Sequence, residues 1–455
     1  MSTAATHRHA KRAVLRGTLV AAWMVIVAHA HAFEQHTAHG GPIKGLALSP
    51  DGRWLVSTSF DYTAVLWSLP ALDERRRLVG HEAAVNAAAF SPDGQLLATA
   101  GDDARIRIWR LAELLDDRRE PEPRVLDGHT AKVVHLAFSP DGMTLASSSW
   151  DHRIGLWSVP DLRLRTFLVG HDGPVNVSQF SDDGASLYSA GADGHIRLWS
   201  VIDGRQLTSL TNHGWGITVM AVDEARDLLV YGASDGAMRS RSLSGTRPAV
   251  DYVVEGKPVL ALNEDRATGQ LAFGSSDGRV VIVDSATAGI VHDFHATSGP
   301  VWALTQLPGA ASLVFAGLDD HITRIPLGDG VQDADDPASA RRFHPVRKLS
   351  NGERQFARKC SICHSLESSD RRRAGPSLRG IFGRRAGSID DYPYSPALAH
   401  ADVVWDEQTI DALFRDGPQV VTPGSKMPLQ RITDSRDRHD LIEFLKTATG
   451  TPTTN

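Results

Sequence analysis

The sequence predicts two domains of different class, an all-β propeller of seven blades followed by a smaller all-α domain. Three observations lead to this prediction. A pattern of 42 residues recurs through the first two thirds of the chain. After a stretch rich in Gly, Asp and Ala, the apolar residues change to a helical spacing. The helical part contains the only two cysteines of the 455 residues, in the sequence Cys360-Ser361-Ile362-Cys363-His364.

Residues 1–32 have the pattern of a secretory signal peptide. Basic residues precede an apolar run from Leu15 to about Ala28, and Ala30-His31-Ala32 follows with small residues at the separation that a signal peptidase uses. The apolar run is short for a bilayer span. We therefore expect cleavage after Ala32, a periplasmic location and no stable membrane span in the mature protein. An uncleaved N-terminal anchor is the alternative.

Charge is unevenly divided along the chain. Residues 341–455 carry a formal charge of +5, whereas residues 33–340 carry −15 and the whole chain −6. A hydrophobic fraction of 42% and a charged fraction of 22% are ordinary for a globular protein and exclude collagen-like and polytopic membrane classes. The acidic mature chain argues against nucleic-acid binding. The asymmetry bears on the choice of partner rather than on the fold.

Each repeat consists of a Gly-His pair or its equivalent followed by three short apolar bursts. The equivalent positions are separated by 42 residues, with one step of 48 that contains a charged insert, Leu114 to Pro123. These positions are His39, His81, His129, His171, His213, Glu255 and Thr297. Ser-Pro-Asp-Gly and Asp-containing turns separate the bursts, which indicates short antiparallel strands. Four strands per repeat, seven times over residues 33–330, predict blades arranged radially.

The last repeat lacks a convincing fourth strand. Its sequence ends near Gly328 in a polar stretch. Phe33 to Thr37, just before the first repeat, can supply the missing strand. We expect this segment to complete the last blade and close the ring.

The repeats resemble the WD-repeat propeller family in a motif of His, Ser or Thr at +18, Asp at +22 and Trp at +28. The motif is present as His39/Ser57/Asp61/Trp67, His81/Thr99/Asp103/Trp109, His129/Ser147/Asp151/Trp157 and His171/Ser189/Asp193/Trp199. The resemblance implies a hydrogen-bonded network that staples each blade. The last three repeats have Tyr231, Phe273 and Phe315 at the Ser/Thr position. We expect apolar packing to replace the network there.

The sequence Cys360-x-x-Cys363-His364 is typical of covalent haem attachment. Two thiols at this spacing can add to the two vinyl groups of one haem, and the histidine is placed to bind the iron. A thioredoxin-like redox pair and half of a zinc site are the alternatives. A redox pair of this kind occurs in a βαβ unit, and a zinc site needs another pair of ligands. The sequence shows neither feature. One covalent haem c agrees with export, because this attachment takes place outside the bacterial cytoplasm.

The part with helical spacing predicts a separate domain over residues 347–449, after a linker at 331–346. Gly352, Phe356 and Cys360 recur at four-residue steps, which places the haem motif at the end of one short helix. A second apolar pattern around Leu441 and Leu445 predicts a C-terminal helix that packs across the first.

Counting the methionines narrows the candidates for a second iron ligand. Of the six methionines only Met427 lies in this domain, in a proline-flanked loop about sixty residues after the haem motif. A thioether is a soft neutral donor that favours ferrous iron. The alternatives are a Met427 that only packs, or ligation by His344, His400 or His439.

Residues 347–449 resemble class I cytochromes c of the mitochondrial and bacterial c2 kind. The opening helix with Gly352, Phe356 and the haem motif matches that family, as does the segment Ala374–Gly387. The resemblance implies that the Pro376 carbonyl orients the His364 imidazole. It implies contacts with a haem propionate for Arg384, Tyr394 and Trp405. Ser425 replaces a usual Thr, and Phe414 replaces a Tyr that supports the iron–sulfur bond in many members.

A basic run has two interpretations: a solvated surface, or a docking face for an acidic redox partner. The run comprises Arg371, Arg372 and Arg373, with Arg384, Arg385 and Lys426 expected near the same haem edge. The acidic propeller itself is one candidate for that partner.

These features predict an exported electron carrier, and not a catalyst, whose propeller is a docking scaffold for a protein redox partner. The sequence contains no catalytic triad, P-loop or dinucleotide fingerprint. One alternative is an oxidoreductase whose propeller holds a substrate or a second cofactor. Another is a redox-sensing adaptor, in which the haem state alters what the propeller binds.

Overall fold

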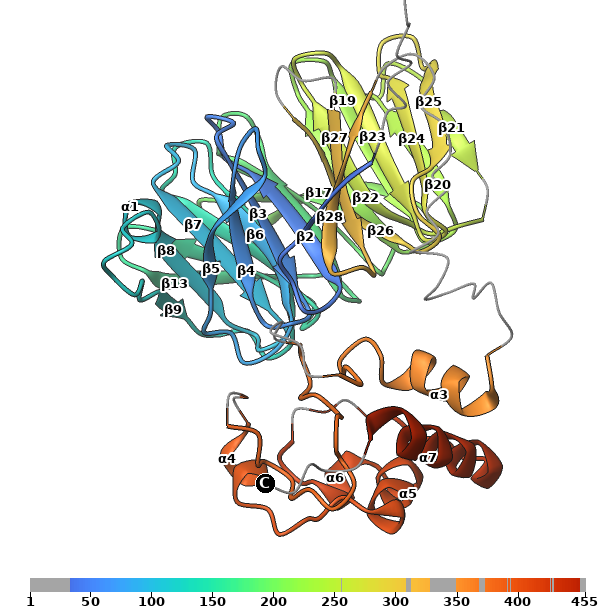
Figure 1. The fold of residues 1–455 in the computed structure, drawn as a ribbon. Coiled ribbons are helices and arrows are strands. Elements are labelled where there is room, and N and C mark those ends of the chain that lie inside the picture. Colours follow the sequence, from blue (N-terminus) through green and yellow to red (C-terminus); the bar gives the residue numbers. More distant parts are fainter. Residues whose placement is uncertain are drawn as a thin grey trace, which may run out of the picture. The chain divides into compact units, whose positions relative to one another are not determined.

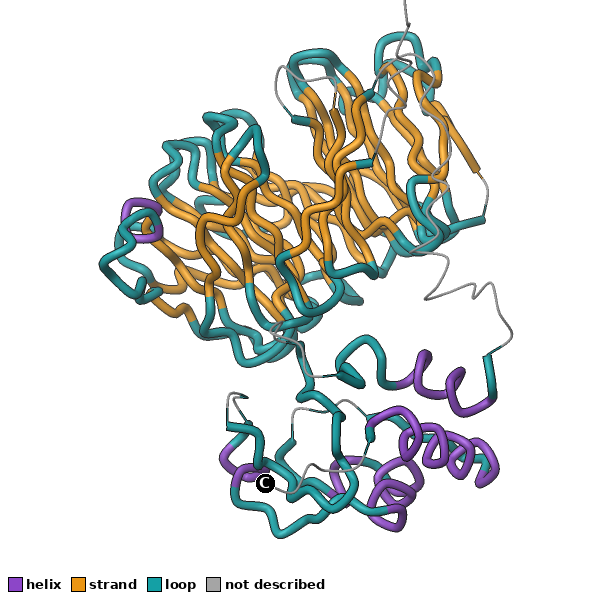
Figure 2. Tube along the Cα trace, viewed as in Figure 1, coloured by secondary structure: helices purple, strands orange, loops and turns teal. Residues whose placement is uncertain are grey.

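The computed structural model describes residues 33–254, 256–307, 312–327, 349–367, 373–390, 392, 394–425, 427 and 429–450. The predicted signal peptide at 1–32 and the linker at 331–346 lie outside the described residues, so both remain predictions. The described chain forms two kinds of structure, strands up to residue 326 and helices from residue 351, with one short helix among the strands (Figure 1, Figure 2).

The strand-rich part consists of seven antiparallel four-stranded sheets, as predicted. Blades one to three contain β2 (Ile43–Leu48), β3 (Trp54–Ser59), β4 (Ala64–Ser68) and β5 (Asp73–Leu78); β6 (Val85–Phe90), β7 (Leu96–Gly101), β8 (Ile106–Arg110) and β9 (Arg124–Leu126); and β10 (Val133–Phe138), β11 (Thr144–Ser149), β12 (Arg153–Ser158) and β13 (Arg163–Val169). The predicted insert after β8 begins with the short helix α1 (Leu111–Leu114).

The remaining four blades repeat the same strand order. They contain β14 (Val175–Phe180), β15 (Ser186–Gly191), β16 (His195–Ser200) and β17 (Gln206–Asn212); β18 (Ile217–Asp223), β19 (Leu228–Ala233), β20 (Ala237–Arg241) and β21 (Val250–Val254); β22 (Val259–Asp265), β23 (Gln270–Ser275), β24 (Arg279–Asp284) and β25 (Ile290–His295); and β26 (Val301–Gln306), β27 (Ser312–Gly317), β28 (His321–Pro326) and β1 (Glu34–Thr37). The first strand of each blade contacts the first strands of both neighbouring blades, which makes a closed inner ring.

The ring is closed by its N-terminal strand, and the predicted closure is confirmed. β1 pairs antiparallel with β28 in the register Glu34↔Arg324, Gln35↔Thr323, His36↔Ile322 and Thr37↔His321. The Glu34 carboxylate also forms an ion pair with Arg324. The seventh blade thus combines residues from both ends of the propeller, so this blade cannot complete its sheet without the N-terminal segment.

Local turn chemistry explains why the inner hairpins form. In the first blade the hydroxyl of Ser49 donates to Asp51 Oδ1 at 2.6 Å, and the Arg53 amide donates to the same oxygen at 3.1 Å. Gly52 adopts a φ of 68°, which a side chain would disfavour. The Ser-x-Asp-Gly pattern therefore folds the chain back on itself before any distant contact is made.

The predicted network is present in the first four blades. In the first, His39 Nδ1 lies 3.0 Å from Asp61 Oδ2 and His39 Nε2 lies 2.7 Å from Ser57 Oγ. The Trp67 indole donates to the same hydroxyl at 2.8 Å. Blades two to four repeat these contacts around His81, His129 and His171. Each network joins the second and third strands of its blade to the two loops that carry the His and the Asp.

The fifth blade differs from the expectation that apolar packing alone replaces the network. His213 Nε2 lies 3.0 Å from Asp235 Oδ2, and the Tyr231 hydroxyl lies 3.3 Å from His213 Nδ1. The phenol reaches the ring from the position where the other blades have a hydroxyl. A tyrosine can therefore retain part of the network, because it carries its own hydroxyl at the end of the aromatic ring.

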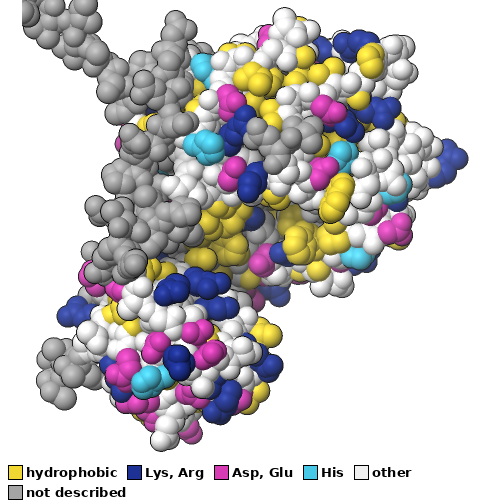
Figure 3. All heavy atoms as spheres, turned by 90° about the vertical axis from the view of Figure 1, so that its right-hand side faces the viewer, with side chains coloured by type: hydrophobic (Ala, Val, Ile, Leu, Met, Phe, Trp, Pro, Cys, Tyr) yellow, Lys and Arg dark blue, Asp and Glu magenta, His cyan; other side chains and the backbone are white. Residues whose placement is uncertain are grey.

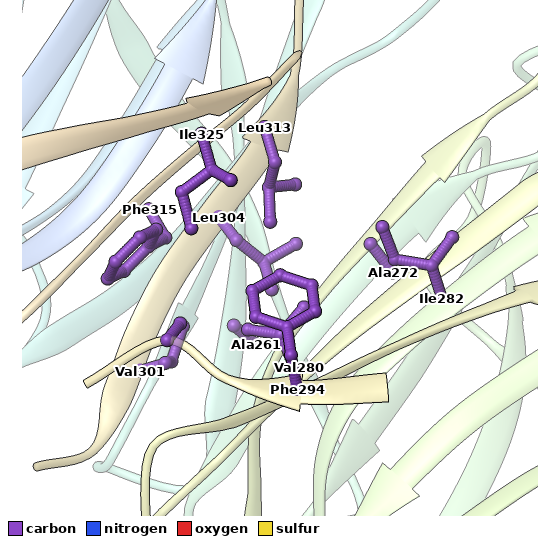
Figure 4. Packing of buried hydrophobic residues seen from close by; sticks show 11 residues of the cluster. Ala261, Ala272, Val280, Ile282, Phe294, Val301, Leu304, Leu313, Phe315 and Ile325 are labelled. Atoms are coloured by element: carbon purple, nitrogen blue, oxygen red, sulfur yellow. The ribbon is translucent and has the colours of Figure 1, made fainter. Parts of the chain in front are cut away.

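The sixth and seventh blades follow the expectation. Phe315 and Ile325, at the Ser/Thr and Trp positions of the last blade, are buried in one apolar cluster with residues of the sixth blade (Figure 4). Phe273 and Val283 are fully buried in the neighbouring cluster. Branched and aromatic side chains fill the space that the Trp and its partners occupy elsewhere.

The C-terminal part contains α3 (Asn351–Lys359), α4 (Pro396–Ala399), α5 (Glu407–Asp416), α6 (Pro418–Val421) and α7 (Ser435–Thr449). As predicted, α7 packs across α3. A Cβ atom on Gly352 would lie 2.1 Å from the Asp440 carbonyl oxygen, so the crossing needs glycine there. Among the described residues, no helix is long and apolar enough to cross a membrane.

Candidate functional site

The haem motif begins at the end of α3, a helix with a well-defined start. The Ser350 hydroxyl accepts from the Glu353 amide at 3.2 Å, and the Ser350 amide donates to the Glu353 carboxylate at 2.8 Å. These reciprocal bonds form a capping box. Asn351 holds α3 to α7 by donating to Asp437 and Asp440 at 2.7 and 2.8 Å.

A tight turn follows α3 and places the two cysteines and the histidine close together. The amides of Cys363 and His364 both donate to the Cys360 carbonyl, at 3.0 and 2.9 Å. Both thiols are free; Cys360 is buried and Cys363 is half-buried. Burial raises the pKa of Cys360 to about 12 and also raises that of Cys363, so both are neutral thiols at neutral pH.

The His364 ring is held in one orientation by the segment that runs alongside it. Its Nδ1 lies 2.8 Å from the Pro376 carbonyl oxygen. A carbonyl only accepts, so Nδ1 carries the proton and Nε2 keeps a free lone pair. Burial lowers the pKa of His364, with the charges of Arg373 and Arg384 adding to the effect against the Pro376 hydrogen bond. The result is a neutral imidazole with one basic nitrogen available.

Gly375 provides the surface on which this ring rests. A Cβ atom at this position would lie 2.4 Å from Cε1 of His364 and 2.7 Å from Nε2. The Gly375 amide donates to the Cys363 carbonyl at 2.8 Å, which fixes the segment beside the motif. The close approach of backbone and imidazole is therefore built into the turn.

The eight site residues predicted from the sequence line one pocket. They are Cys360, Cys363, His364, Pro376, Arg384, Tyr394, Trp405 and Met427. The rest of its wall is mainly apolar and includes Leu378, Ile381, Leu398, Ile410, Leu413 and Phe414. Most of these side chains belong to the core of the helical domain. The pocket thus combines sulfur and imidazole donors with an apolar interior.

Met427 lies in the wall of this pocket and is half-buried. His400 and His439 are exposed and do not line the pocket, and His344 lies outside the described residues. Behind the loop, the Thr422 hydroxyl donates to Ser425 Oγ at 3.2 Å. Phe414 is buried in the same wall, so its position carries no hydroxyl that could reach the sulfur.

Arg384 and Trp405 are joined across the pocket wall by their backbones. The Trp405 amide donates to the Arg384 carbonyl at 2.9 Å, and the Gly383 amide donates to the Trp405 carbonyl at 2.8 Å. The Arg384 guanidinium donates to the carbonyls of Arg379 and Ser377, both at 2.7 Å. Among the described residues, no carboxylate lies within 4.0 Å of it. Burial lowers the pKa of Arg384 and raises that of Tyr394.

Comparison with known proteins identifies this helical domain. The family model described as "Cytochrome c" matches residues 349–449. Cytochrome c of Sesamum indicum is 37% identical over 106 residues, which cover 23% of this chain and 94% of that protein. The chain belongs to the cytochrome c family. A cytochrome c homolog of Rickettsia felis is 43% identical over 111 residues, 24% of this chain and 62% of the homolog. Cytochrome c of Chlamydomonas reinhardtii is 37% identical over 105 residues, which cover 93% of its length.

A second family model matches the propeller. The model described as "WD domain, G-beta repeat" matches residues 31–68, 73–110, 121–158 and 162–200. These four matches cover the blades that carry the complete His–Ser/Thr–Asp–Trp network. The chain therefore combines a seven-bladed WD40 propeller with a cytochrome c domain. The three relatives cover 23–24% of this chain, and the chain spans 62% of the Rickettsia felis homolog.

The residues of the cytochrome c domain fit a haem. The pocket offers an apolar interior, two thiols beside a neutral imidazole, and a thioether. The Arg384 guanidinium, which has no carboxylate partner among the described residues, suits an anionic substituent at the pocket wall. Gly375 leaves room for the His364 imidazole against the backbone. Cys360, Cys363 and His364 are the residues that would hold the haem.

Two contributors were missed by reasoning from sequence. Tyr392 donates its hydroxyl hydrogen bond to the Ala374 carbonyl, and its ring centroid lies 4.7 Å from that of Tyr394. Arg373 donates to the Ser361 carbonyl at 2.9 Å, so it braces the motif as well as adding to surface charge. The repeated Tyr-x-Tyr spacing was the available signal for Tyr392. No sequence signal separates Arg373 from its neighbours Arg371 and Arg372, which lie outside the described residues together with Lys426.

Charge on the cytochrome c domain is mixed in the view of Figure 3, where basic and acidic side chains lie close together. Arg385 forms an ion pair with Asp402 at 3.1 Å, and Arg415 pairs with Asp411 at 3.0 Å. Three of the six residues of the predicted basic docking face, Arg371, Arg372 and Lys426, lie outside the described residues, so that face remains a prediction.

Proposed function

We propose that the protein is an exported electron carrier, with one haem held covalently by Cys360 and Cys363 and its iron ligated by His364 and Met427. The observation that carries the proposal is the His364 ring. Its Nδ1 proton is donated to the Pro376 carbonyl, which leaves the Nε2 lone pair free on a ring that lines the pocket. A bound haem supplies a one-electron couple there.

The chain's own residues set the conditions for that couple. The hydrogen bond from Nδ1 to Pro376 makes the imidazole a stronger donor and prevents its rotation. The thioether of Met427 favours the ferrous state, and the apolar wall limits the access of water. If His364 and Met427 both hold the iron, no coordination position would remain for a substrate, which supports electron exchange rather than catalysis.

The first experiment tests covalent attachment. The intact protein, purified from a host that exports and matures c-type cytochromes, should gain the mass of one haem, and the haem should remain after extraction with acidified acetone. A Cys360→Ser/Cys363→Ser variant should lose both properties. A wild-type chain without the added mass would refute the proposal, because the thiols would then serve another role.

The second experiment separates a carrier from an enzyme. Metal and cofactor analysis should find one haem iron per chain and no further cofactor, and a redox titration should show one reversible one-electron step. A second cofactor bound by the propeller would favour the oxidoreductase alternative.

We further propose that the propeller docks the redox partner and that maturation removes residues 1–32. The closed ring of seven blades, four of which match the WD domain model, supports a scaffold role. N-terminal sequencing of the exported protein should begin at Phe33. A sequence that begins at Met1 or Ser2 would overturn the cleavage.

A further inference from the structure

Lysine is rare in the propeller, and its positions are not scattered. Residues 33–327 contain 22 arginines and only three lysines, Lys44, Lys132 and Lys257. Lys44 is the second residue of β2, Lys132 immediately precedes β10, and Lys257 lies two residues before β22. These are all first strands of their blades, and they belong to the inner ring. Because every blade repeats one strand order around the ring, the three lysines lie on the same end face of the propeller.

Large aromatic side chains gather on this face as well. Trp302 is the second residue of β26, Trp150 directly follows β11, and Trp215 lies two residues before β18. None of the three occupies the Trp position of a blade network. Trp150 and Trp215 are 44% and 64% exposed, unusual for side chains of this size. Exposed tryptophan next to cationic groups is typical of protein interfaces.

Two of the lysines are held in place by these rings. Lys44 Nζ lies 4.4 Å from the centroid of the Trp302 ring, and Lys132 Nζ lies 3.4 Å from that of Trp150. Phe60 supports Trp302 from the side, with ring centroids 5.8 Å apart. A cation–π contact positions an ammonium group without neutralising it.

Among the described residues, no carboxylate oxygen lies within 4.0 Å of the ammonium group of Lys44 or Lys132. Asp102, whose charge acts on Lys44, accepts a hydrogen bond from the Asn86 side chain at 2.8 Å. Burial and the charge of Lys132 lower the pKa of Lys44 to about 8, against the attraction of Asp102. A ligand that brings a carboxylate would remove this cost.

We propose that this end face binds an acidic segment of a partner polypeptide, with Lys44 and Lys132 receiving carboxylates and the exposed tryptophans receiving apolar side chains. Charge complementarity selects this occupant. A long polyanion such as nucleic acid or an anionic membrane would meet the −15 charge of residues 33–340 beyond the lysines, whereas a short acidic segment meets only the lysine cluster.

This inference rests on the docking role in the proposed function and not on the haem chemistry, so its test uses no electron transfer. The full chain is titrated into a fluorescein-labelled peptide of alternating glutamate and leucine, and binding is read by anisotropy. Lys44→Gln/Lys132→Gln should weaken binding about tenfold or more, because each loss leaves a carboxylate without its partner. Arg118→Gln/Arg119→Gln removes the same charge from the opposite end, after β8, and should change the affinity less than about twofold.

A second readout protects the test against misfolding of the lysine variant. In the wild-type chain, amine-specific acylation followed by peptide mass spectrometry should label Lys44, and the acidic peptide should protect Lys44 and Lys132 while leaving Lys446 labelled. Equal loss of binding in both double variants, or acylation unaffected by the peptide, would overturn the proposal. So would tighter binding of phosphatidylglycerol vesicles or single-stranded DNA than of the acidic peptide. A normal redox titration alongside any of these failures would leave the electron-carrier proposal intact.

Discussion

Gly375 presses its backbone against the ring of His364 so closely that a Cβ atom would lie 2.4 Å from Cε1. This contact joins a residue of the haem motif to a segment eleven positions later. We therefore predict that Gly375→Ala displaces the imidazole and lowers stability by about 1–3 kcal/mol, as overpacking does. The absorption spectrum of the purified protein should show altered axial ligation, and denaturant unfolding should show the lost stability.

Gly383→Ala is the matched control for that change. Gly383 has a φ of 81° and open space around its Cβ position, so alanine adds strain without touching the ring. It should lower stability by about 1 kcal/mol and leave the spectrum unchanged. If both variants keep the wild-type spectrum, Gly375 does not position His364.

Met427→Ala should remove the ferric charge-transfer band that reports an iron–thioether bond and should lower the reduction potential. The physical reason is that a soft thioether stabilises the ferrous state. Absorption spectra and a redox titration measure both effects. Met143→Ala, which changes a 55% exposed methionine of the propeller, should change neither. A band that survives in Met427→Ala would assign the ligand elsewhere.

Removal of Phe33–Thr37 should destabilise the propeller, because β28 loses its only described partner on that edge. We expect a loss of about 2 kcal/mol or more, which corresponds to a fall of about 3 °C or more in Tm for a domain of this size. Calorimetry of the full chain measures the change. Glu34→Ala, which removes the ion pair with Arg324 but keeps the strand, should have a much smaller effect. An unchanged melting temperature in the deletion would show that the ring is closed without β1.

Ser147→Ala should cost more stability than Tyr231→Phe. Ser147 Oγ lies 2.7 Å from both His129 Nε2 and Trp157 Nε1. Its loss therefore leaves two buried nitrogen atoms without this hydrogen-bond partner. We expect about 2–4 kcal/mol for Ser147→Ala and about 1 kcal/mol for Tyr231→Phe, whose hydroxyl has one contact at 3.3 Å. Denaturant unfolding of both variants tests the difference. Equal costs would mean that the fifth blade depends on its hydrogen bonds as strongly as the third.

Acid should weaken the blades that carry the His–Asp network. Burial opposes ionisation of Asp61, but His39, Thr63 and the Gly40 amide outweigh it and lower the pKa from 3.8 to about 2. A carboxyl whose pKa is depressed by folding stabilises the protein above its unfolded value and loses that contribution as pH falls through the folded one. We expect the loss between about pH 4 and pH 2, worth about 2 kcal/mol for Asp61.

The acid prediction is checked by thermal unfolding of the full chain over that pH range. Asp61→Asn should be less stable at neutral pH, and its propeller melting temperature should fall less steeply with acid than that of the wild type. Asp172→Asn changes a carboxylate that is 90% exposed and should leave the steepness of that fall unchanged. A fall in Asp61→Asn as steep as in the wild type would contradict the role given to Asp61.

The number of blades, the closing strand and the haem motif could all be predicted from the amino-acid sequence alone. Each depends on local chemistry that repeats or stands close together in the chain, such as the Ser-Pro-Asp-Gly turns and the spacing of Cys360, Cys363 and His364. Resemblance to families added Pro376, Arg384, Tyr394 and Trp405, and the structure places all four in one pocket wall.

The tertiary structure is needed to find which side chains meet across long stretches of chain. It places Nδ1 of His364 against the Pro376 carbonyl, the Tyr231 hydroxyl in the network of the fifth blade, and the ammonium groups of Lys132 and Lys44 over the rings of Trp150 and Trp302. Periodicity cannot reveal these contacts. They depend on how distant strands and loops close around one another, and on which polar groups that closure leaves without a partner.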